Sequence, residues 1–264
     1  MEKTTFSDGG VAEYQASHFV SAAFDLDKHE ALGEKYGVQG VPTSFFVAPD
    51  GELLLTVDRP MAIDGYRELL KNVFDGYAEL VKARKEPAGE HLVGAAYAKI
   101  GNHEKAKPSY EKAVERLEAK ADKQEADRRR VAETLSRIAD SLIALEGKPE
   151  EGRVLADRMA KADPDGAFKT RDNLIFLRAW VAFGDQRNDE MLAGLKEVLE
   201  KHPDSDKLED TMVIYASAML NLKKDKKAAE ALLRSFLEKF PKSSFREQVQ
   251  HMLQHATGEH GDHD

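Results

Sequence analysis

The chain has 264 residues, of which 41% are apolar and 33% charged, and it contains no cysteine. This composition is typical of a helix-rich globular protein with one or two domains, and it excludes a fibrous or disordered chain. Without cysteine, this polypeptide can hold no disulfide, zinc–thiolate site, iron–sulfur cluster or thiol nucleophile.

Net charge and hydropathy limit the classes of partner and the cellular compartments that we expect for this chain. The net charge of −9 argues against nucleic acid, because neutralisation of phosphates supplies most non-specific affinity. No run of about 18 apolar residues predicts a membrane-spanning helix. The N-terminus shows neither the apolar stretch nor the cleavage site of a signal peptide. We therefore expect a cytoplasmic protein as the chain is written; a natural form with a longer N-terminus leaves export to the periplasm open.

The spacing of apolar residues changes near residue 85, which predicts two domains, 1–84 and 85–256. In the first domain the patterns are short and punctuated by Gly, Pro and Asp, whereas the second is Ala/Leu-rich and helix-periodic. The predicted elements of the first domain are a helix over 11–19, a strand over 18–24, a helix over 29–36, a hairpin with strands 43–48 and 52–57, and an amphipathic helix over 63–82.

The string Lys35-Tyr-Gly-Val-Gln-Gly-Val-Pro-Thr-Ser-Phe-Phe, followed by Pro49-Asp-Gly-Glu, resembles the second half of a thioredoxin-fold protein. The resemblance covers about residues 3–84. It implies that Pro42 follows a cis peptide bond and that the main chain of Val41 pairs with an extended substrate peptide. Val41, Pro42 and Thr43 are therefore the candidate substrate-peptide site; the alternative is a plain Val-Pro turn before an edge strand.

The same resemblance draws attention to what is missing. In such relatives a strand and a Cys-x-x-Cys segment precede the region that begins here at Met1. Without the first two strands of that fold, the strands at 19–24 and 43–48 would flank an empty position with unpaired backbone groups. Our hypothesis is an N-terminally truncated thioredoxin-like domain whose natural form begins upstream. The alternative is a degenerate domain that closes differently and has given up redox chemistry.

The second domain resembles an array of tetratricopeptide (TPR-like) repeats of about four helix pairs with a capping helix over 245–255. Positions of the first repeat fit without a gap: Val93, Gly94, Tyr97, Gly101, Ala106, Tyr110 and Ala113. Prolines at 164, 203 and 241 recur 39 and 38 residues apart, longer than the usual ~34. Residues 111–146 contain no Pro or Gly, which predicts two lengthened helices that meet near 121–123. The predicted fold is a partial α/β thioredoxin-like domain followed by an all-α repeat domain.

Such repeats offer a concave surface for peptides or folded proteins. Repeats that grip a C-terminal carboxylate do so with Lys, Arg and Asn of their inner helices. By residue type the candidates in the repeat groove are Lys99, Asn102, Arg137, Asn173 and Arg178, and ordinary solvated surface is the alternative.

Four of the nine histidines lie in the last fourteen residues. The pair His251/His255 could ligate a divalent metal, but we expect residues 257–264 to form a disordered His/acid-rich tail and predict no metal site and no cofactor. No phosphate loop, nucleophile elbow or dinucleotide fingerprint is present. Trp180 is predicted to be a core residue of a repeat helix.

Three functions remain open. The first is a thioredoxin-family repeat protein that performs thiol–disulfide exchange, or redox-linked client binding, in a natural full-length form but is redox-inactive as this cysteine-free chain. The second is a non-catalytic peptide-binding or holding co-chaperone. The third is a protein-interaction scaffold that uses only the repeats. All three expect client proteins or peptides as partners and no membrane.

Overall fold

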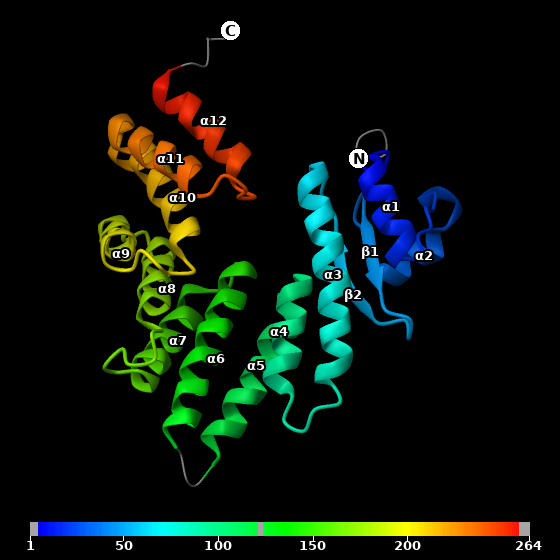
Figure 1. Ribbon diagram of the computed structural model, residues 1–264, viewed down its shortest axis with the longest axis horizontal. Helices are drawn as coiled ribbons and strands as arrows, with labels where there is room; N and C mark the ends of the chain where they lie inside the picture. Colours follow the sequence, from blue (N-terminus) through cyan, green and yellow to red (C-terminus); the bar gives the residue numbers. More distant parts are fainter. Residues whose placement is uncertain (1–4, 121–123, 259–264) are drawn as a thin grey trace. The chain divides into compact units, whose positions relative to one another are not determined.

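The computed structural model describes residues 5–120 and 124–258 and is mostly helical (Figure 1). The chain divides into two compact units, one up to Ala113 and one from Val114 onward. Helix α5 (His103–Glu118) begins in the first unit and ends in the second. The division predicted after residue 84 therefore falls inside the first unit, whose helices α4 and α5 pack with the preceding elements.

The first unit contains most of the elements that the sequence predicts. In chain order these are α1 (Gly9–His18), the 3-10 turn η1 (Leu26–Lys28), α2 (Glu30–Tyr36), β1 (Ser44–Val47), β2 (Leu53–Val57), α3 (Ile63–Ala83), α4 (Glu90–Ile100) and α5. The turn that contains Gly51, at a φ of 88°, joins β1 to β2 as an antiparallel pair. Glycine adopts this left-handed conformation without the steric cost that a Cβ brings.

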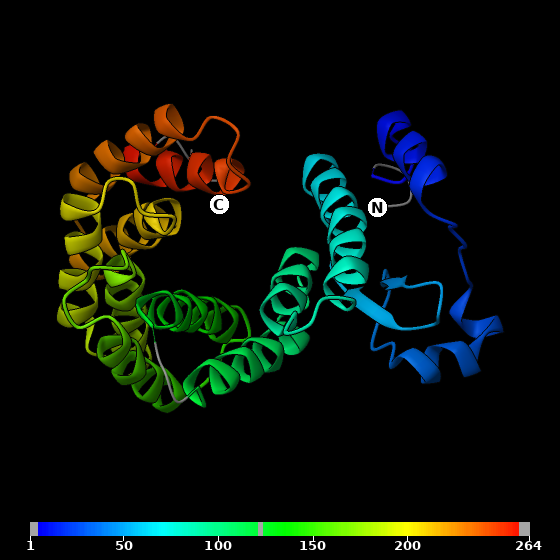
Figure 2. The ribbon, with the colours of Figure 1, turned by 60° about the horizontal axis from the view of Figure 1, so that its bottom comes forward.

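The strand expected over residues 18–24 is not formed. Helix α1 occupies residues up to His18, and residues 19–25 are an irregular segment that connects it to η1 (Figure 2). Among the described residues the sheet has only two strands, in the order β1–β2. A strand is defined by backbone hydrogen bonds to a neighbour, and none of the described elements supplies one here. The apolar pattern of this segment was therefore a wrong guide to a strand.

The second unit consists of helix pairs, as the repeat pattern predicts. Its elements are α6 (Glu125–Ala144), α7 (Pro149–Ala162), α8 (Arg171–Gly184), α9 (Asn188–Lys201), α10 (Leu208–Ala218) with the π-helical turn η2 (Met219–Lys223), α11 (Lys226–Lys239) and α12 (Arg246–Thr257). Pro164, Pro203 and Pro241 each follow the second helix of a pair, where a residue that cannot continue a helix is expected. Helix α12 is the predicted cap.

Small residues set the spacing between neighbouring helices. A Cβ on Gly94 of α4 would lie 2.6 Å from the ring of Tyr110 on α5, and a Cβ on Gly152 of α7 would lie 2.9 Å from the ring of Trp180 on α8. Tyr110 and Ala106 are fully buried. These neighbouring helices can approach closely because no side chain separates them at these points. Trp180 is half-buried against α7.

Helices α5 and α6, with 16 and 20 residues, are longer than the 14-residue helices α7, α8 and α9. The prediction of two lengthened helices is confirmed, while their predicted meeting point at 121–123 lies outside the described residues. Beyond Gly258, the predicted disordered tail also lies outside the described residues. No helix in the described ranges is both long and apolar enough to cross a membrane.

Candidate functional site

The loop of Val41, Pro42 and Thr43 connects α2 to β1. Helix α2 ends at Gly37, whose left-handed conformation turns the chain toward this loop. The Val41–Pro42 peptide bond is cis, as the resemblance implied. The Thr43 hydroxyl donates a hydrogen bond of 2.5 Å to the carbonyl of Gly40, and the Val41 side chain is 78% exposed. The loop thus presents an apolar side chain to solvent.

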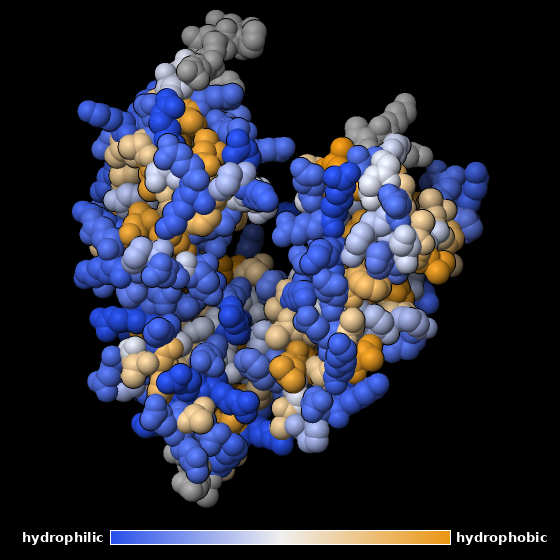
Figure 3. Space-filling view, viewed as in Figure 1, coloured by the Kyte–Doolittle hydropathy of each residue, from blue (hydrophilic) through white to orange (hydrophobic). Residues whose placement is uncertain are grey.

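Other apolar side chains of the first unit are also exposed. Val20 is fully exposed, Phe24 is 59% exposed and Val47, on β1, is 41% exposed. Phe46 of the same strand is buried and packs edge-on against Phe19, with ring centroids 5.9 Å apart. Figure 3 shows apolar side chains interrupting the polar surface around α2 and the hairpin. Among the described elements, no strand pairs with the side of β1 that faces away from β2. The unit therefore offers apolar surface beside an open strand edge.

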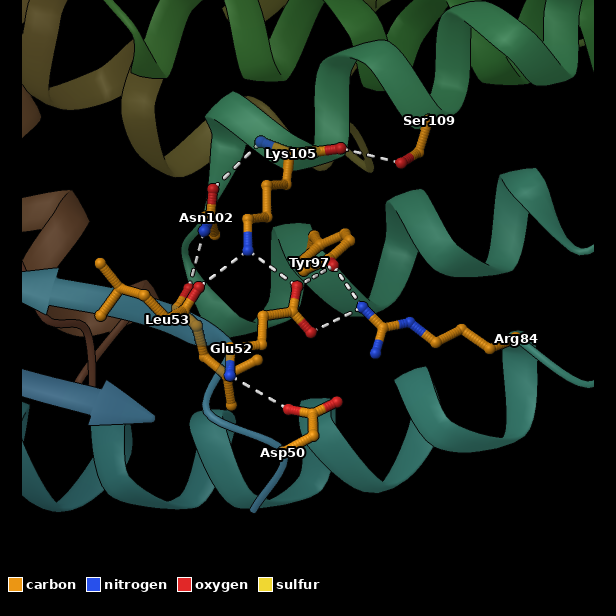
Figure 4. A network of polar contacts seen from close by, with 9 residues as sticks. Asp50, Glu52, Leu53, Arg84, Tyr97, Asn102, Lys105 and Ser109 are labelled. Atoms are coloured by element: carbon orange, nitrogen blue, oxygen red, sulfur yellow. Dashed lines mark hydrogen bonds and ion pairs between the residues drawn. The ribbon is translucent and has the colours of Figure 1, made fainter. Parts of the chain in front are cut away.

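A network of charged groups joins the hairpin to the first helix pair (Figure 4). The Glu52 carboxylate, just before β2, accepts hydrogen bonds from Lys105 Nζ at 2.7 Å, from the Tyr97 hydroxyl at 2.6 Å and from Arg84 at 2.7 Å. Arg84 also donates to the Tyr97 hydroxyl oxygen at 2.7 Å. These partners come from the end of α3, from α4 and from α5. One carboxylate therefore links three helices to the sheet.

The electrostatics of this network follow from its geometry. Partial burial alone would raise the pKa of Glu52, but hydrogen bonds from Lys105, Tyr97 and Arg84 outweigh it and lower the pKa to about 2. Burial, followed by the hydrogen bond to Glu52, raises the pKa of the Tyr97 phenol. Glu52 is thus a permanent anion at neutral pH, held by two cations. Fixed in this way, it is suited to positioning the hairpin rather than to proton transfer.

Two of the predicted groove residues are used inside the first unit. Asn102 Nδ2 donates to the carbonyl of Leu54 at 2.7 Å, and its Oδ1 caps α5 by accepting the Lys105 amide at 3.0 Å. Lys99 Nζ lies 2.6 Å from Glu79 of α3. The polar groups of the first repeat therefore hold the hairpin and α3.

The other three groove candidates lie in the second unit, and the structure does not gather them into one cluster. Arg137 on α6 lies 3.3 Å from Asp140 and 3.6 Å from Asp206. Asn173 is half-buried on α8, and Arg178, five residues further along α8, is exposed. Five residues correspond to about 500° of helical rotation, about 140° beyond one full turn, so Asn173 and Arg178 face different sides of α8.

His251 and His255 are exposed on α12, with ring centroids 4.7 Å apart. Within residues 5–120 and 124–258, no group of three or more His, Asp or Glu side chains is arranged to hold a metal ion.

Comparisons with known proteins bear on the last helix pair. A tetratricopeptide repeat model matches residues 210–243. These residues span most of α10, all of η2 and α11, and the loop that contains Pro241. No curated protein matches the chain. The match identifies one helix pair as a tetratricopeptide repeat, a unit that generally mediates binding between proteins.

The Glu52 network was missed by sequence reasoning. Its hydrogen-bonded side chains are separated by 13 to 53 residues in the chain, and nothing in the local pattern distinguishes Glu52 from other acids that follow a turn. The sequence pattern identifies Tyr97 as a repeat position, but it does not indicate that the Tyr97 hydroxyl bonds to Glu52.

Proposed function

We propose that the chain is a non-catalytic protein-binding module. Its helical repeats bind a partner protein, and the Val41–Pro42–Thr43 loop holds an extended, apolar segment of that partner. The observation that carries the proposal is the tetratricopeptide repeat at 210–243 within a series of similar helix pairs, because such arrays present continuous binding surfaces. The exposed side chains of Val20, Phe24 and Val41 support a role for the loop region.

The absence of cysteine favours this role over catalysis. Thiol–disulfide exchange proceeds by attack of a thiolate on a disulfide, and this polypeptide has no thiol. The second candidate is redox-linked client handling by a natural form that carries cysteines. It is supported by the order of α2, the loop of residues 37–43, the hairpin and α3, whereas the family match lies within the helical repeats alone.

A turbidity assay with insulin separates these roles. A small dithiol reduces insulin, and the released B chain aggregates. We expect the chain to delay turbidity at substoichiometric ratios, since it holds the exposed apolar segments. We expect no acceleration of disulfide reduction when the dithiol is limiting. Accelerated reduction would contradict the assignment, and absence of any delay would leave only a scaffold role for the repeats.

A pair of matched variants locates the holding surface. Val41→Asp places a charge on the loop, and Val154→Asp places one on α7 at a side chain that is 63% exposed. Burial of a valine side chain contributes about 1.5 kcal/mol, so Val41→Asp should weaken holding roughly tenfold. Val154→Asp should behave as the unmodified chain. Equal losses in both variants would show that holding does not depend on the loop.

A further inference from the structure

The two edges of the sheet in the first unit differ in what covers them. In the described part of the chain β1 and β2 form a sheet of two strands, so each strand has one edge that faces away from its neighbour. Such an edge presents backbone N–H and C=O groups that a strand of another chain can bind, and proteins protect it with charged side chains, prolines, bulges or a covering element. An edge without such protection is therefore a candidate for pairing with another strand.

Side chains of the first helix pair protect β2. Asn102 Nδ2 donates a hydrogen bond of 2.7 Å to the carbonyl of Leu54, and Lys105 Nζ donates one of 2.8 Å to the carbonyl of Leu53 (Figure 4). The register of the strand pair also shifts between Phe46 and Val47, an irregularity of the kind that bends a strand pair locally. Two consecutive carbonyls of β2 are thus occupied, and a charged side chain stands beside them. A further strand is therefore excluded from this edge.

Strand β1 has none of these protections. Outside the β1–β2 pair, residues Ser44–Val47 make no backbone–backbone hydrogen bond with any other described residue. Residues 36–49 contain no charged side chain, although charged residues make up 33% of the chain. Pro42 and Pro49 both lie outside the strand. The edge of β1 is therefore open to a further strand.

Apolar side chains lie along this open edge. Val47, at the end of β1, is 41% exposed. Phe45 is half-buried and packs against Tyr36, with ring centroids 5.1 Å apart. Successive side chains of a strand point to opposite faces of the sheet, so Phe46 lies on the face opposite to Phe45. A strand added beside β1 would therefore have apolar neighbours on both of its faces.

We propose that this edge binds a second copy of the chain, with the two β1 strands antiparallel about a two-fold axis. The product is a four-stranded sheet in which the two β2 strands lie outermost. Identical strands can meet here because residues 36–49 carry no charge, and like charges directly opposite each other would destabilise the pair. A two-fold interface uses the same surface of both copies, so the exposed Val47 side chains are covered together.

The protected edge of β2 selects a second copy over an unrelated strand. Each copy brings one open edge and one edge that Asn102 and Lys105 occupy. Pairing through β1 uses both open edges, so no open edge remains in the described sheet and the assembly closes at two chains. An unrelated strand would leave its own second edge exposed. This dimer goes beyond the proposed binding of a partner protein and has a readout of its own.

Sedimentation velocity of the full chain over roughly a hundredfold range of concentration tests the dimer. The mass should rise from 29.4 kDa toward twice that value and no further. Higher salt should strengthen the association, because it screens the repulsion between two chains that each carry a net charge of −9. Hydrogen exchange of the Ser44–Val47 amides should slow as the dimer forms, whereas exchange of the β2 amides should change less.

A matched pair of variants locates the contact. Val47→Lys places a charge on the edge of β1, where it meets the same charge of the other copy, and should raise the dissociation constant about tenfold. Val154→Lys is the control, because Val154 is 63% exposed on α7 and lies outside the sheet. Far-UV circular dichroism shows whether both variants keep the fold. If Val47→Lys does not fold, the exchange of the Ser44–Val47 amides in the unmodified chain decides.

Several results would overturn the proposal. A mass that stays at one chain over the whole range would show that no dimer forms, and growth beyond two chains would show that the edge of β2 is not closed. A dimer that leaves the exchange of the Ser44–Val47 amides unchanged would place the contact elsewhere. Equal loss in Val154→Lys would show that association depends on net charge rather than on this edge. The insulin assay is a separate measurement, so the dimer and the holding role can fail independently.

Discussion

Replacing Glu52 by glutamine tests whether the carboxylate network holds the hairpin to the first helix pair. The side chain keeps its size and one acceptor oxygen but loses the charge that Arg84 and Lys105 pair with, at 2.7 Å each. Tyr97 keeps an acceptor within reach. The substitution therefore removes the electrostatic part of the network with little change in packing.

The magnitude follows from the pKa of Glu52, which falls from 4.5 to about 2 in the folded chain. Since a tenfold change in proton affinity corresponds to about 1.4 kcal/mol, the difference corresponds to at most about 3 kcal/mol. Arg84 and Lys105 are 39% and 38% exposed, so solvent screens part of it. We expect Glu52→Gln to lower the free energy of unfolding of the first unit by about 1–2 kcal/mol at pH 7.

The direction of the pKa shift determines how the stabilisation by Glu52 varies with pH. Because folding lowers this pKa, the ionised network stabilises the first unit at pH values above 4.5, and the contribution disappears as the pH falls from 4.5 toward 2. The stability difference between the unmodified chain and Glu52→Gln should therefore shrink over that interval. Urea unfolding followed by far-UV circular dichroism measures it, with hydrogen exchange of α4 and α5 locating the change.

Two controls test whether the loss of stability is confined to the Glu52 network. Trp180 is the only tryptophan and lies on α8 of the second unit, so its fluorescence transition should not move. Glu79→Gln removes the exposed pair with Lys99 and should cost less than about 0.5 kcal/mol. A stability difference for Glu52→Gln that is the same at pH 7 and pH 2.5 would refute the reasoning, because it would show that the ionised form is not what stabilises the joint.

Three further substitutions test the packing between helices. Gly94→Ala would place a Cβ 2.6 Å from the Tyr110 ring and should destabilise the first unit by about 1–3 kcal/mol, measured by thermal circular dichroism; an unchanged melting temperature would contradict the close approach of α4 and α5. Gly152→Ala would place a Cβ 2.9 Å from the Trp180 ring and should shift the emission maximum of Trp180. An unchanged emission spectrum would mean that position 152 does not contact this ring. Leu233→Ala, at a side chain that is 1% exposed, should cost about 2–5 kcal/mol in urea unfolding, and a cost below ~1 kcal/mol would mean that α11 is not packed as described.

The helices of both units could be predicted because their signals are local. Small residues such as Gly94 and Ala106 recur at helical spacing, and the prolines at 164, 203 and 241 follow the ends of helices. Each signal acts within about one turn of the residue that carries it. The hairpin was predictable for the same reason, since the turn that contains Gly51 joins its two strands directly.

The segment over 18–24 shows where local signals end. Its apolar residues suit a strand, but a strand forms only where another segment offers its backbone groups, and the described part of the chain offers none there. Sequence pattern specifies which residues favour an extended conformation. Pairing depends on what the fold brings alongside.

The sequence by itself determined that this chain has no thiol chemistry, that it is mostly helical and that helix pairs repeat along it, because composition and periodicity act residue by residue. Only the tertiary structure decided that Glu52 is held by Arg84, Tyr97 and Lys105. Charged side chains look alike in a sequence. Their partners are chosen by the packing of helices whose residues lie tens of positions apart.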